Sequence, residues 1–295
     1  MTNDEMRAKI AAGRGFIAAL DQSGGSTPKA LTGYGVDEGE WSSDEDMFAL
    51  IHQMRSRIIC SPCFTGEKVI GAILFERTMD GTIDGKPTPQ ALIERGIVPF
   101  IKVDKGLEDE SDGVQLMKPM PELDALLARA RGLGVFGTKE RSVIHAANPQ
   151  GIESIVGQQF EVAEQVLRGG MVPIIEPEVN IKSADRAQSD GILKDEILRA
   201  LESVSAPVML KLSIPAEAGR FDPLVDHPKV LKVVALSGGF SRNEACAQLA
   251  NNRGMIASFS RALLSDLRKQ MDDDEFDRSL SGAIDQIRDA SLAGA

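Results

Sequence analysis

Short apolar runs recur along the chain, and each is followed by polar residues and then by a helix-like stretch. The runs are too short for helices and are rich in Val, Ile and Phe, as buried parallel strands are. They predict eight strands, at residues 15–20, 70–75, 98–103, 134–138, 172–175, 207–212, 231–236 and 255–259.

Helical patterns fill the gaps between these runs. Ser42-Ser43-Asp44-Glu45 has the form of a capping box, and Thr88-Pro89 predicts a helix start with Thr as the cap. Strand alternating with helix implies a parallel sheet, and eight such units predict an α/β fold, a closed (β/α)₈ TIM barrel forming one domain over residues 1–295. A doubly wound open sheet is the alternative. Apolar helix faces are predicted for Leu123, Leu126, Leu127 and Ala130, for Ile152, Ile155, Val156, Ala163, Val166 and Leu167, and for Phe276, Leu280, Ile284 and Ile287.

The length and the charge narrow the class of protein. A barrel of this kind typically needs about 250 residues, so 295 residues suit one barrel. The net charge of −11 makes nucleic acid and anionic membranes poor partners, because both reward basic patches. Three cysteines leave an odd number, which favours a reducing compartment over a disulfide framework. Residues 1–14 lack an apolar signal core and no apolar run is long enough to span a bilayer, so we expect a cytoplasmic protein.

Charged residues lie at the carboxyl ends of most of the predicted strands, where an apolar core would be expected. In a barrel, active sites lie at these strand ends. Charges that point inward cost several kcal/mol each unless they are paired or functional. Strand residues two apart share a face, and the charges concerned are Asp21, Lys102 and Asp104, Lys139 and Arg141, Glu176 and Glu178, Lys211 and Arg261.

Lys211 is the candidate nucleophile in this set. A lysine amine attacks a carbonyl only in its neutral form, which burial and a nearby cation, such as Lys139 or Arg141, would favour. Glu176 and Glu178 could then move protons as a carbinolamine becomes an iminium. The structural alternative is that Glu176 and Glu178 are counter-ions to Lys139 and Arg141, and both interpretations can hold together.

Two loops rich in glycine and serine are candidate phosphate sites. Ser237-Gly238-Gly239 follows the seventh run and precedes a helix from about Arg242. Glycine amides beside a helix N-terminus can bind an anion, and the loops after the seventh and eighth strands are the recurrent phosphate site of barrels. Arg261 could bind the same phosphate, and Ser23-Gly24-Gly25-Ser26 is a second loop of this kind. The structural alternative for each loop is a tight turn.

No metal or cofactor is expected. His52, His145 and His227 are scattered along the chain and form no plausible ligand cluster. Cys60 and Cys63 have CxxC spacing, but no second pair accompanies them, so we interpret them as residues at the end of a buried helix.

Six segments together resemble class I fructose-bisphosphate aldolase, most closely its shorter bacterial branch. The resemblance extends in order over about nine tenths of the chain. It implies a (β/α)₈ barrel that cleaves fructose 1,6-bisphosphate reversibly to dihydroxyacetone phosphate and glyceraldehyde 3-phosphate, in glycolysis and gluconeogenesis, without a metal. The segments are Gly15-Phe16-Ile17-Ala18-Ala19-Leu20-Asp21-Gln22-Ser23, Lys102-Val103-Asp104-Lys105-Gly106, Glu176-Pro177-Glu178, Leu210-Lys211, Leu236-Ser237-Gly238-Gly239 and Ser258-Phe259-Ser260-Arg261.

The resemblance also implies residue roles. It makes Lys211 the Schiff-base lysine and Glu176 the main general acid/base. Lys139 would be the second active-site lysine, Asp21 would accept the C4 hydroxyl proton as the C3–C4 bond breaks, and Glu178 would pair with the lysines. The C1 phosphate would be held by Ser237, Gly238, Gly239 and Arg261, and the C6 phosphate by Ser23, Ser26, Lys102 and Arg141.

Two departures from the family pattern leave parts of this scheme open. The long vertebrate enzymes end in a tyrosine that helps to protonate the enamine, whereas the only tyrosine here is Tyr34. Glu176 or a water is therefore the candidate proton donor. Ala30 replaces a cationic residue, which predicts a weaker hold on the C6 phosphate.

The substrate and the assembly also remain open. The expected partner is a small sugar bisphosphate, and a homo-oligomer is not decided by the sequence. The alternatives in function are another Schiff-base sugar-phosphate lyase and a non-catalytic sugar-phosphate-binding barrel.

Overall fold

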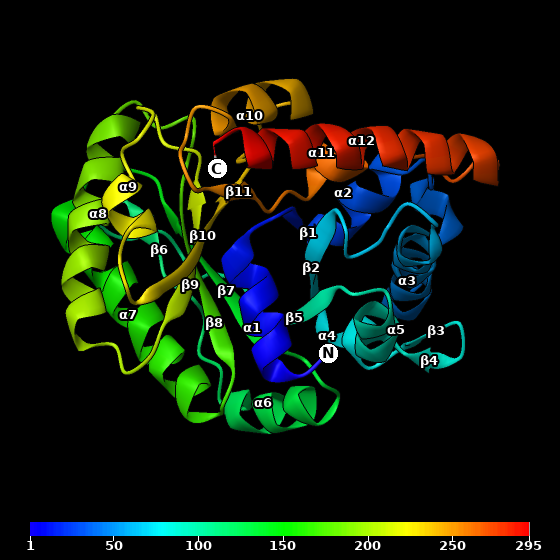
Figure 1. Cartoon of the computed structure of the whole chain (residues 1–295), viewed down its shortest axis with the longest axis horizontal. Helices are drawn as coiled ribbons and strands as arrows, with labels where there is room; N and C mark the ends of the chain where they lie inside the picture. Colours follow the sequence, from blue (N-terminus) through cyan, green and yellow to red (C-terminus); the bar gives the residue numbers. More distant parts are fainter. Residues whose placement is uncertain (295) are drawn as a thin grey trace.

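A computed structural model describes residues 1–294 and contains a barrel of eight strands (Figure 1). Each strand hydrogen-bonds in parallel to the next along the chain. All eight predicted strands are present, and the fold is the predicted (β/α)₈ barrel. The strands are β1 (Phe16–Leu20), β2 (Val69–Leu74), β5 (Val98–Lys102), β7 (Gly137–Ile144), β8 (Val172–Val179), β9 (Val208–Ser213), β10 (Val230–Leu236) and β11 (Ile256–Ala257).

The barrel closes between its last and first strands. β11 has only two residues, and it pairs with β10 through Val234 opposite Ile256. Beyond it, the backbone N–H of Ala19 in β1 donates to the carbonyl of Phe259 at 3.1 Å. This contact joins the two edges, so the doubly wound open sheet is excluded.

Helices connect the strands and cover the outside of the barrel (Figure 1). Two short antiparallel strands, β3 (Thr82–Ile83) and β4 (Lys86–Pro87), form a hairpin, and β6 (Val114–Gln115) adds to β7. The helices are α1 (Asn3–Ala12), α2 (Ser26–Gly33), α3 (Asp44–Cys60), α4 (Glu76–Met79), α5 (Thr88–Glu94), α6 (Leu123–Gly132), α7 (Pro149–Arg168), α8 (Arg186–Ser203), α9 (Asp222–Val225), α10 (Arg242–Leu249), α11 (Arg261–Leu264) and α12 (Asp273–Ala293), and a 3-10 turn spans Glu38–Glu40.

Some predicted boundaries were wrong by a residue or more. The cap of α3 is Ser43, whose side chain accepts from Asp46 N, rather than Ser42. Pro87 is the cap of α5, so Thr88 is already helical. β7 and β8 extend to Ile144 and Val179, well beyond the apolar runs that predicted them, because polar inward residues continue both strands.

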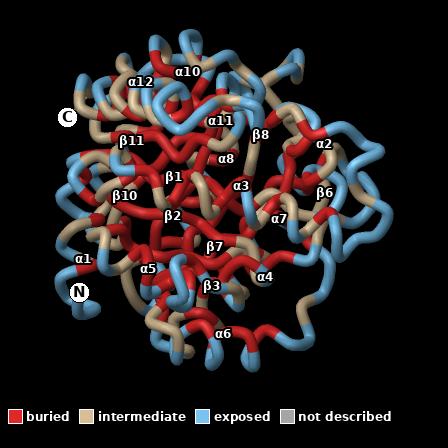
Figure 2. Tube along the Cα trace, turned by 90° about the vertical axis from the view of Figure 1, so that its right-hand side faces the viewer, coloured by how far each residue is buried: buried red, intermediate tan, exposed pale blue. Residues whose placement is uncertain are grey.

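Buried residues run along the strands and the inner faces of the helices (Figure 2), and the apolar ones form two separate clusters. The larger cluster lies between the strands and the helices, and it includes the predicted apolar faces of α6, α7 and α12. The smaller cluster fills the barrel interior with residues such as Ile17, Phe100, Ile174 and Met209. Met6 and Ile10 of α1 belong to this interior cluster, so α1 closes the end of the barrel opposite the carboxyl ends of the strands.

No helix within residues 1–294 combines the length and apolar character that crossing a bilayer requires.

Candidate active site

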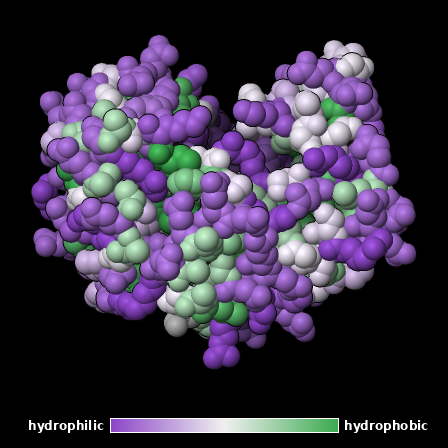
Figure 3. Space-filling model, turned by 90° about the horizontal axis from the view of Figure 1, so that it is seen from above, coloured by the Kyte–Doolittle hydropathy of each residue, from purple (hydrophilic) through white to green (hydrophobic). Residues whose placement is uncertain are grey.

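A cavity of about 810 Å³ lies at the carboxyl ends of the strands. In the view from above, the molecular surface has a deep notch between two raised, mostly hydrophilic parts (Figure 3). The cavity collects side chains from seven strands or the loops that follow them. Among the predicted site residues, it is lined by Asp21, Ser23, Ser26, Lys102, Lys139, Arg141, Glu176, Glu178, Lys211, Ser237, Gly238 and Arg261.

Lys139 is at the centre of a buried ionic cluster. Its Nζ lies 2.7 Å from Asp21 Oδ2, 2.9 Å from Glu176 Oε2 and 4.0 Å from Asp104 Oδ2. The four side chains come from β7, β8 and the ends of β1 and β5, and all are almost fully buried. A buried charge is tolerated when opposite charges surround it, and here one cation is shared by three carboxylates.

Glu176 bridges the two lysines. Its Oε1 lies 3.0 Å from Lys211 Nζ, while Oε2 faces Lys139. The pairing of β8 with β9, which sets Ile174 opposite Met209, brings Glu176 alongside Lys211. The strand is held from behind by Gln159 of α7, whose Oε1 accepts from Glu176 N at 2.9 Å. The carboxylate is thus fixed within proton-transfer distance of the candidate nucleophile.

The charges within the cluster shift the pKa values of its members. Burial alone would raise the pKa of the Asp21 and Glu176 carboxyls, but Lys139 and Lys211 outweigh it and hold both below their usual range. Burial alone would lower the pKa of Lys139, but Asp21, Glu176 and Asp104 outweigh it and raise this pKa. Lys139 is therefore a permanent cation at neutral pH, and the carboxylates are held in the form that accepts protons.

Two further ion pairs lie beside this cluster, and one of them differs from what the family resemblance implied. Glu178 Oε2 lies 2.5 Å from Arg141 Nε, and no lysine pairs with Glu178 within residues 1–294. The expected pairing of Glu178 with the lysines was therefore wrong, whereas pairing with Arg141, expected from the residues alone, is present. Lys102 Nζ lies 2.5 Å from Asp104 Oδ1, so this lysine already has a counter-ion beside the cavity.

The loop after β10 approaches Arg261, as expected of an anion site. Gly238 and Gly239 have φ of +58° and +117°, a backbone region that favours glycine. A Cβ on Gly239 would be 3.6 Å from a terminal nitrogen of Arg261, so the loop lies against that guanidinium, although Gly239 does not line the cavity. At the start of the next helix, Ser241 and Glu244 form a capping box and neither residue lines the cavity, so a contribution of this helix N-terminus stays a prediction.

The loop after β1 forms a compact turn that also lines the cavity. Ser26 Oγ donates to Ser23 O at 2.8 Å and accepts from Ser23 N at 3.0 Å. Both serines line the cavity beside Lys29 and Ala30. The two glycine-serine loops thus lie on the wall of one cavity, which fits a ligand with two anionic groups.

The polar residues that line the cavity and that sequence reasoning missed include Gln22, Ser258 and Ser260. Ser258 is 1% exposed, and its hydroxyl has no hydrogen-bond partner among the described residues. All three lie within the segments quoted for the family resemblance, yet nothing in their local pattern sets them apart from ordinary loop residues. Their importance depends on contacts between distant parts of the chain.

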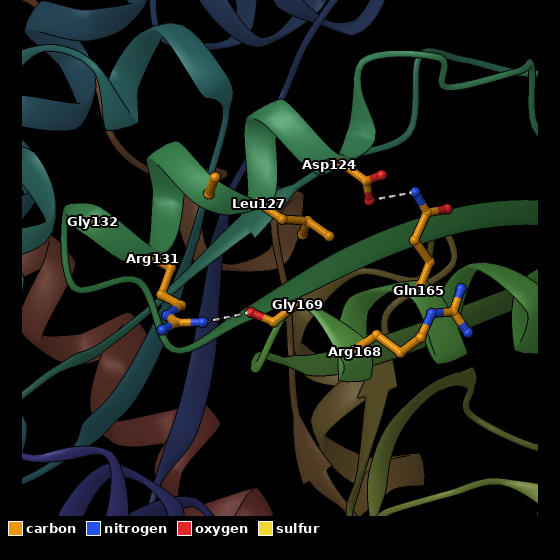
Figure 4. A pocket seen from close by; sticks show the side chains of 8 residues that line it. Asp124, Leu127, Arg131, Gly132, Gln165, Arg168 and Gly169 are labelled. Atoms are coloured by element: carbon orange, nitrogen blue, oxygen red, sulfur yellow. Dashed lines mark hydrogen bonds between the residues drawn. The ribbon is translucent and has the colours of Figure 1, made fainter.

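A second cavity, of about 660 Å³, lies between α6 and α7 (Figure 4). Arg131 donates to the carbonyl of Gly169 at 3.3 Å, and Gln165 donates to Asp124 at 2.7 Å. These side chains are partly or fully exposed and bond to one another, so no buried reactive group faces this cavity. Within residues 1–294, no three His, Cys, Asp or Glu side chains are grouped to hold a metal ion.

Comparison with protein families places this chain beside a known family. The sequence model of the family described as fructose-bisphosphate aldolase class-I matches residues 3–203 of this chain. This span includes Asp21, Lys139 and Glu176, and it ends before Lys211.

Two solved structures are similar in fold. The fructose-bisphosphate aldolase of Plasmodium falciparum, solved with TRAP and a small-molecule inhibitor, gives a TM-score of 0.82 at 20% identity, covering 99% of this chain and 95% of that one. An archaeal fructose 1,6-bisphosphate aldolase gives a TM-score of 0.56 at 13% identity, covering 98% and 100%. At these identities the similarity shows the shared barrel.

Proposed function

Because this chain belongs to the class-I fructose-bisphosphate aldolase family, we propose that it cleaves fructose 1,6-bisphosphate reversibly through a Schiff base on Lys211. The observation that carries the proposal is the bridge that Glu176 makes between Lys211, at 3.0 Å, and Lys139, at 2.9 Å. It places a buried amine, an acid/base group and a fixed cation in one cavity. This is the set that iminium chemistry needs.

In the first half of the reaction, the neutral amine of Lys211 attacks C2 of the ketose. Glu176 accepts a proton from the nitrogen and passes it to the oxygen, which gives the carbinolamine. A second proton, taken up from solvent by way of Glu176, then lets this hydroxyl leave as water. Lys139, held cationic by its carboxylates, stabilises the oxygen as negative charge develops there. The product is a protonated iminium, which accepts electrons from the C3–C4 bond far better than a ketone does.

In the second half, Asp21 accepts the C4 hydroxyl proton as the C3–C4 bond breaks. The low pKa of Asp21 keeps it in the basic form, beside Lys139 at 2.7 Å. Glyceraldehyde 3-phosphate leaves, and the enamine on Lys211 is protonated at C3 by Glu176 or a water. Hydrolysis then releases dihydroxyacetone phosphate and the free amine.

The two loops supply orientation. Ser237, Gly238, Gly239 and Arg261 would hold the C1 phosphate, and Ser23, Ser26, Lys102 and Arg141 the C6 phosphate. Binding energy at two remote anions fixes the sugar so that C2 meets Lys211 and the C4 hydroxyl meets Asp21. Lys102 and Arg141 already have carboxylate partners, so they would have to share their charge with the phosphate.

We also propose that the protein acts in the cytoplasm. All three cysteines, Cys60, Cys63 and Cys246, are free thiols. Burial raises the pKa of each thiol, which makes it less reactive. Such thiols persist in a reducing compartment.

The test is chemical trapping. The protein is incubated with fructose 1,6-bisphosphate and EDTA, reduced with borohydride, and digested for peptide mass spectrometry. We expect a substrate-dependent adduct on Lys211 and turnover that EDTA does not change. Lys211→Met is the matched control, and its kcat should be lower by roughly 10⁴-fold or more.

Three outcomes would redirect the proposal. An adduct that persists in Lys211→Met would move the nucleophile elsewhere. Equal turnover of fructose 1-phosphate and the bisphosphate would favour another Schiff-base lyase over a two-phosphate enzyme. Binding of the bisphosphate with neither an adduct nor turnover would indicate a sugar-phosphate-binding barrel.

A further inference from the structure

Arg55 is a fully buried cation that forms no direct ion pair in the described part of the chain. It projects from α3 and is 0% exposed. Within residues 1–294, no acidic side chain forms an ion pair with it, and its Nε has no hydrogen-bond partner. Burying an unpaired charge costs several kcal/mol, so its position requires an explanation beyond packing.

The Arg55 guanidinium instead binds neutral oxygens next to the candidate active site. One terminal nitrogen donates to Thr78 Oγ1 at 2.6 Å. The other donates to the main-chain carbonyl of Gln22 at 2.5 Å and to the side-chain Oε1 of Gln22 at 3.2 Å. Gln22 follows Asp21 directly, so Arg55 fixes both the backbone beside the proposed base and the direction of the Gln22 amide.

The orientation of that amide determines what Ser260 can do. Because Gln22 Oε1 accepts from Arg55, its Nε2 faces the other way and donates to Ser260 Oγ at 2.6 Å and to Ala19 O at 3.3 Å. Ser260 Oγ is thereby an acceptor of this bond, and its own proton has no acceptor among the described residues. Gln22, Ser260 and Arg261 all line the cavity.

We infer that Arg55 is a positioning residue that, through Gln22, turns the hydroxyl proton of Ser260 toward a phosphate oxygen bound beside Arg261. The inference rests on the proposed function only in requiring a phosphorylated ligand at that end of the cavity. Every donor in the chain from Arg55 to Gln22 to Ser260 points the same way, from a cation toward the expected anion. Hydrogen bonds aligned in this way polarise one another and strengthen the last donor.

The neutral amide of Gln22 fixes the direction of this series of hydrogen bonds, because its oxygen accepts and its nitrogen donates. A carboxylate at the same place would still accept from Arg55, and it would also accept the Ser260 proton, so that the hydroxyl would turn away from the cavity. Gln22→Glu therefore separates positioning from stability. It gives Arg55 the counter-ion it lacks, while it removes the donor from the ligand.

The experiment measures binding of inorganic phosphate by calorimetry, together with Tm, for the full chain and its variants. Binding that Arg261→Ala abolishes is assigned to this end of the cavity. Gln22→Glu is expected to keep or raise Tm and to bind this phosphate about tenfold more weakly, as expected for the loss of one hydrogen bond to a charged group. Gln150→Glu, at an exposed site in the first turn of α7, controls for the change in net charge.

A double variant identifies the cause. Adding Ser260→Ala to Gln22→Glu should produce little further loss, because the hydroxyl has already been turned away. Additive losses would instead indicate plain charge repulsion and overturn the inference. Unchanged phosphate affinity in Gln22→Glu, with a raised Tm, would also overturn it and leave Arg55 a purely structural role.

A second variant keeps the test open if Gln22→Glu does not fold. Arg55→Lys retains the charge but cannot bond both Gln22 oxygens and Thr78 in one plane. It should weaken phosphate binding in the same direction, and phosphate affinity equal to wild type would overturn the inference. These measurements require no turnover, so a failure of the Schiff-base proposal, seen as a missing Lys211 adduct, is distinguished from a failure of this one.

Discussion

The same strands line both halves of the barrel interior, but one half is apolar and the other is charged. On β8, Ile174 and Glu176 are two residues apart and point to the same face. Ile174 packs with Phe100, Met209 and the other residues of the interior cluster. One layer higher, Glu176 forms ion pairs with two lysines.

The lower, apolar layer stabilises the barrel, whereas the upper, charged layer carries the proposed chemistry. Each apolar side chain in the lower layer contributes about 1.5–3 kcal/mol by burial alone. The upper layer buries Lys139, Asp21 and Glu176, and such buried ion pairs often contribute no net stability relative to apolar residues of the same size. The lower layer and α1 therefore support a cluster that would not form a stable core by itself.

The largest effect on stability is expected from Lys139→Met. The variant leaves Asp21 and Glu176 buried without their shared cation, and the free energy of unfolding at pH 7 should fall by about 3–5 kcal/mol. Because the folded-state pKa of both carboxyls is depressed, the contribution of their ionised forms is present above about pH 4–5 and is lost as the pH falls. Urea unfolding across pH should show the difference between wild type and variant narrowing in acid. A difference independent of pH would contradict the electrostatic explanation.

The matched change in the lower layer is Ile174→Ala. It should cost about 2–5 kcal/mol through lost burial and a residual cavity, and this cost should be independent of pH. Turnover per folded molecule should change little, because Ile174 lies outside the cavity lining. Calorimetric unfolding combined with active-site titration measures both quantities. A large loss of kcat in the folded variant would mean that the two layers are not separate.

The smallest effect is expected outside the barrel wall, at Glu140. This residue follows Lys139 on β7, is fully buried, and has only a 3.3 Å contact from Thr138 Oγ1. Burial raises its pKa well above the usual value near 4.5, and the nearby Asp104 adds to the shift. The folded state therefore keeps a proton that the unfolded state releases, so stability falls as the pH rises above about 4.5, by at most ~1.4 kcal/mol per pH unit.

Glu140→Gln removes this penalty. The variant should gain stability over wild type between pH 5 and 7, and the gain should vanish near pH 4. Paired unfolding curves at several pH values test this. A gain of constant size would show that the substitution improves packing and does not remove a titration.

The strands could be predicted from sequence because buried parallel strands appear as continuous apolar runs. The same approach failed where charged residues of the candidate site stand in place of apolar residues within a strand. The predicted run at 134–138 stops where Lys139, Glu140 and Arg141 continue β7 to Ile144. The cap of α3 was missed by one residue because Ser42 and Ser43 are both suitable caps, and only the backbone geometry selects Ser43.

The candidate site was predictable to the extent that its residues lie on strands. Alternation along a strand places Lys139, Glu176 and Lys211 on the inner face, and the closed barrel then brings them together. Side chains on loops were not predictable in this way. The contact of Arg55 with Gln22, and that of Gln22 with Ser260, join residues 33 and 238 positions apart, and no local pattern encodes them.

Because α1 closes the lower end of the barrel, it determines where substrate and products can enter and leave. Met6 and Ile10 fill the lower opening, and Lys9 donates to Gly66 O at 2.7 Å, which holds the helix in place. The lower end of the barrel is therefore closed to substrate, and substrate and both products must pass through the end that carries the cavity. In the proposed reaction, the fragment bonded to Lys211 cannot leave until the other has gone, so the order of departure follows from the covalent bond and needs no separate gate.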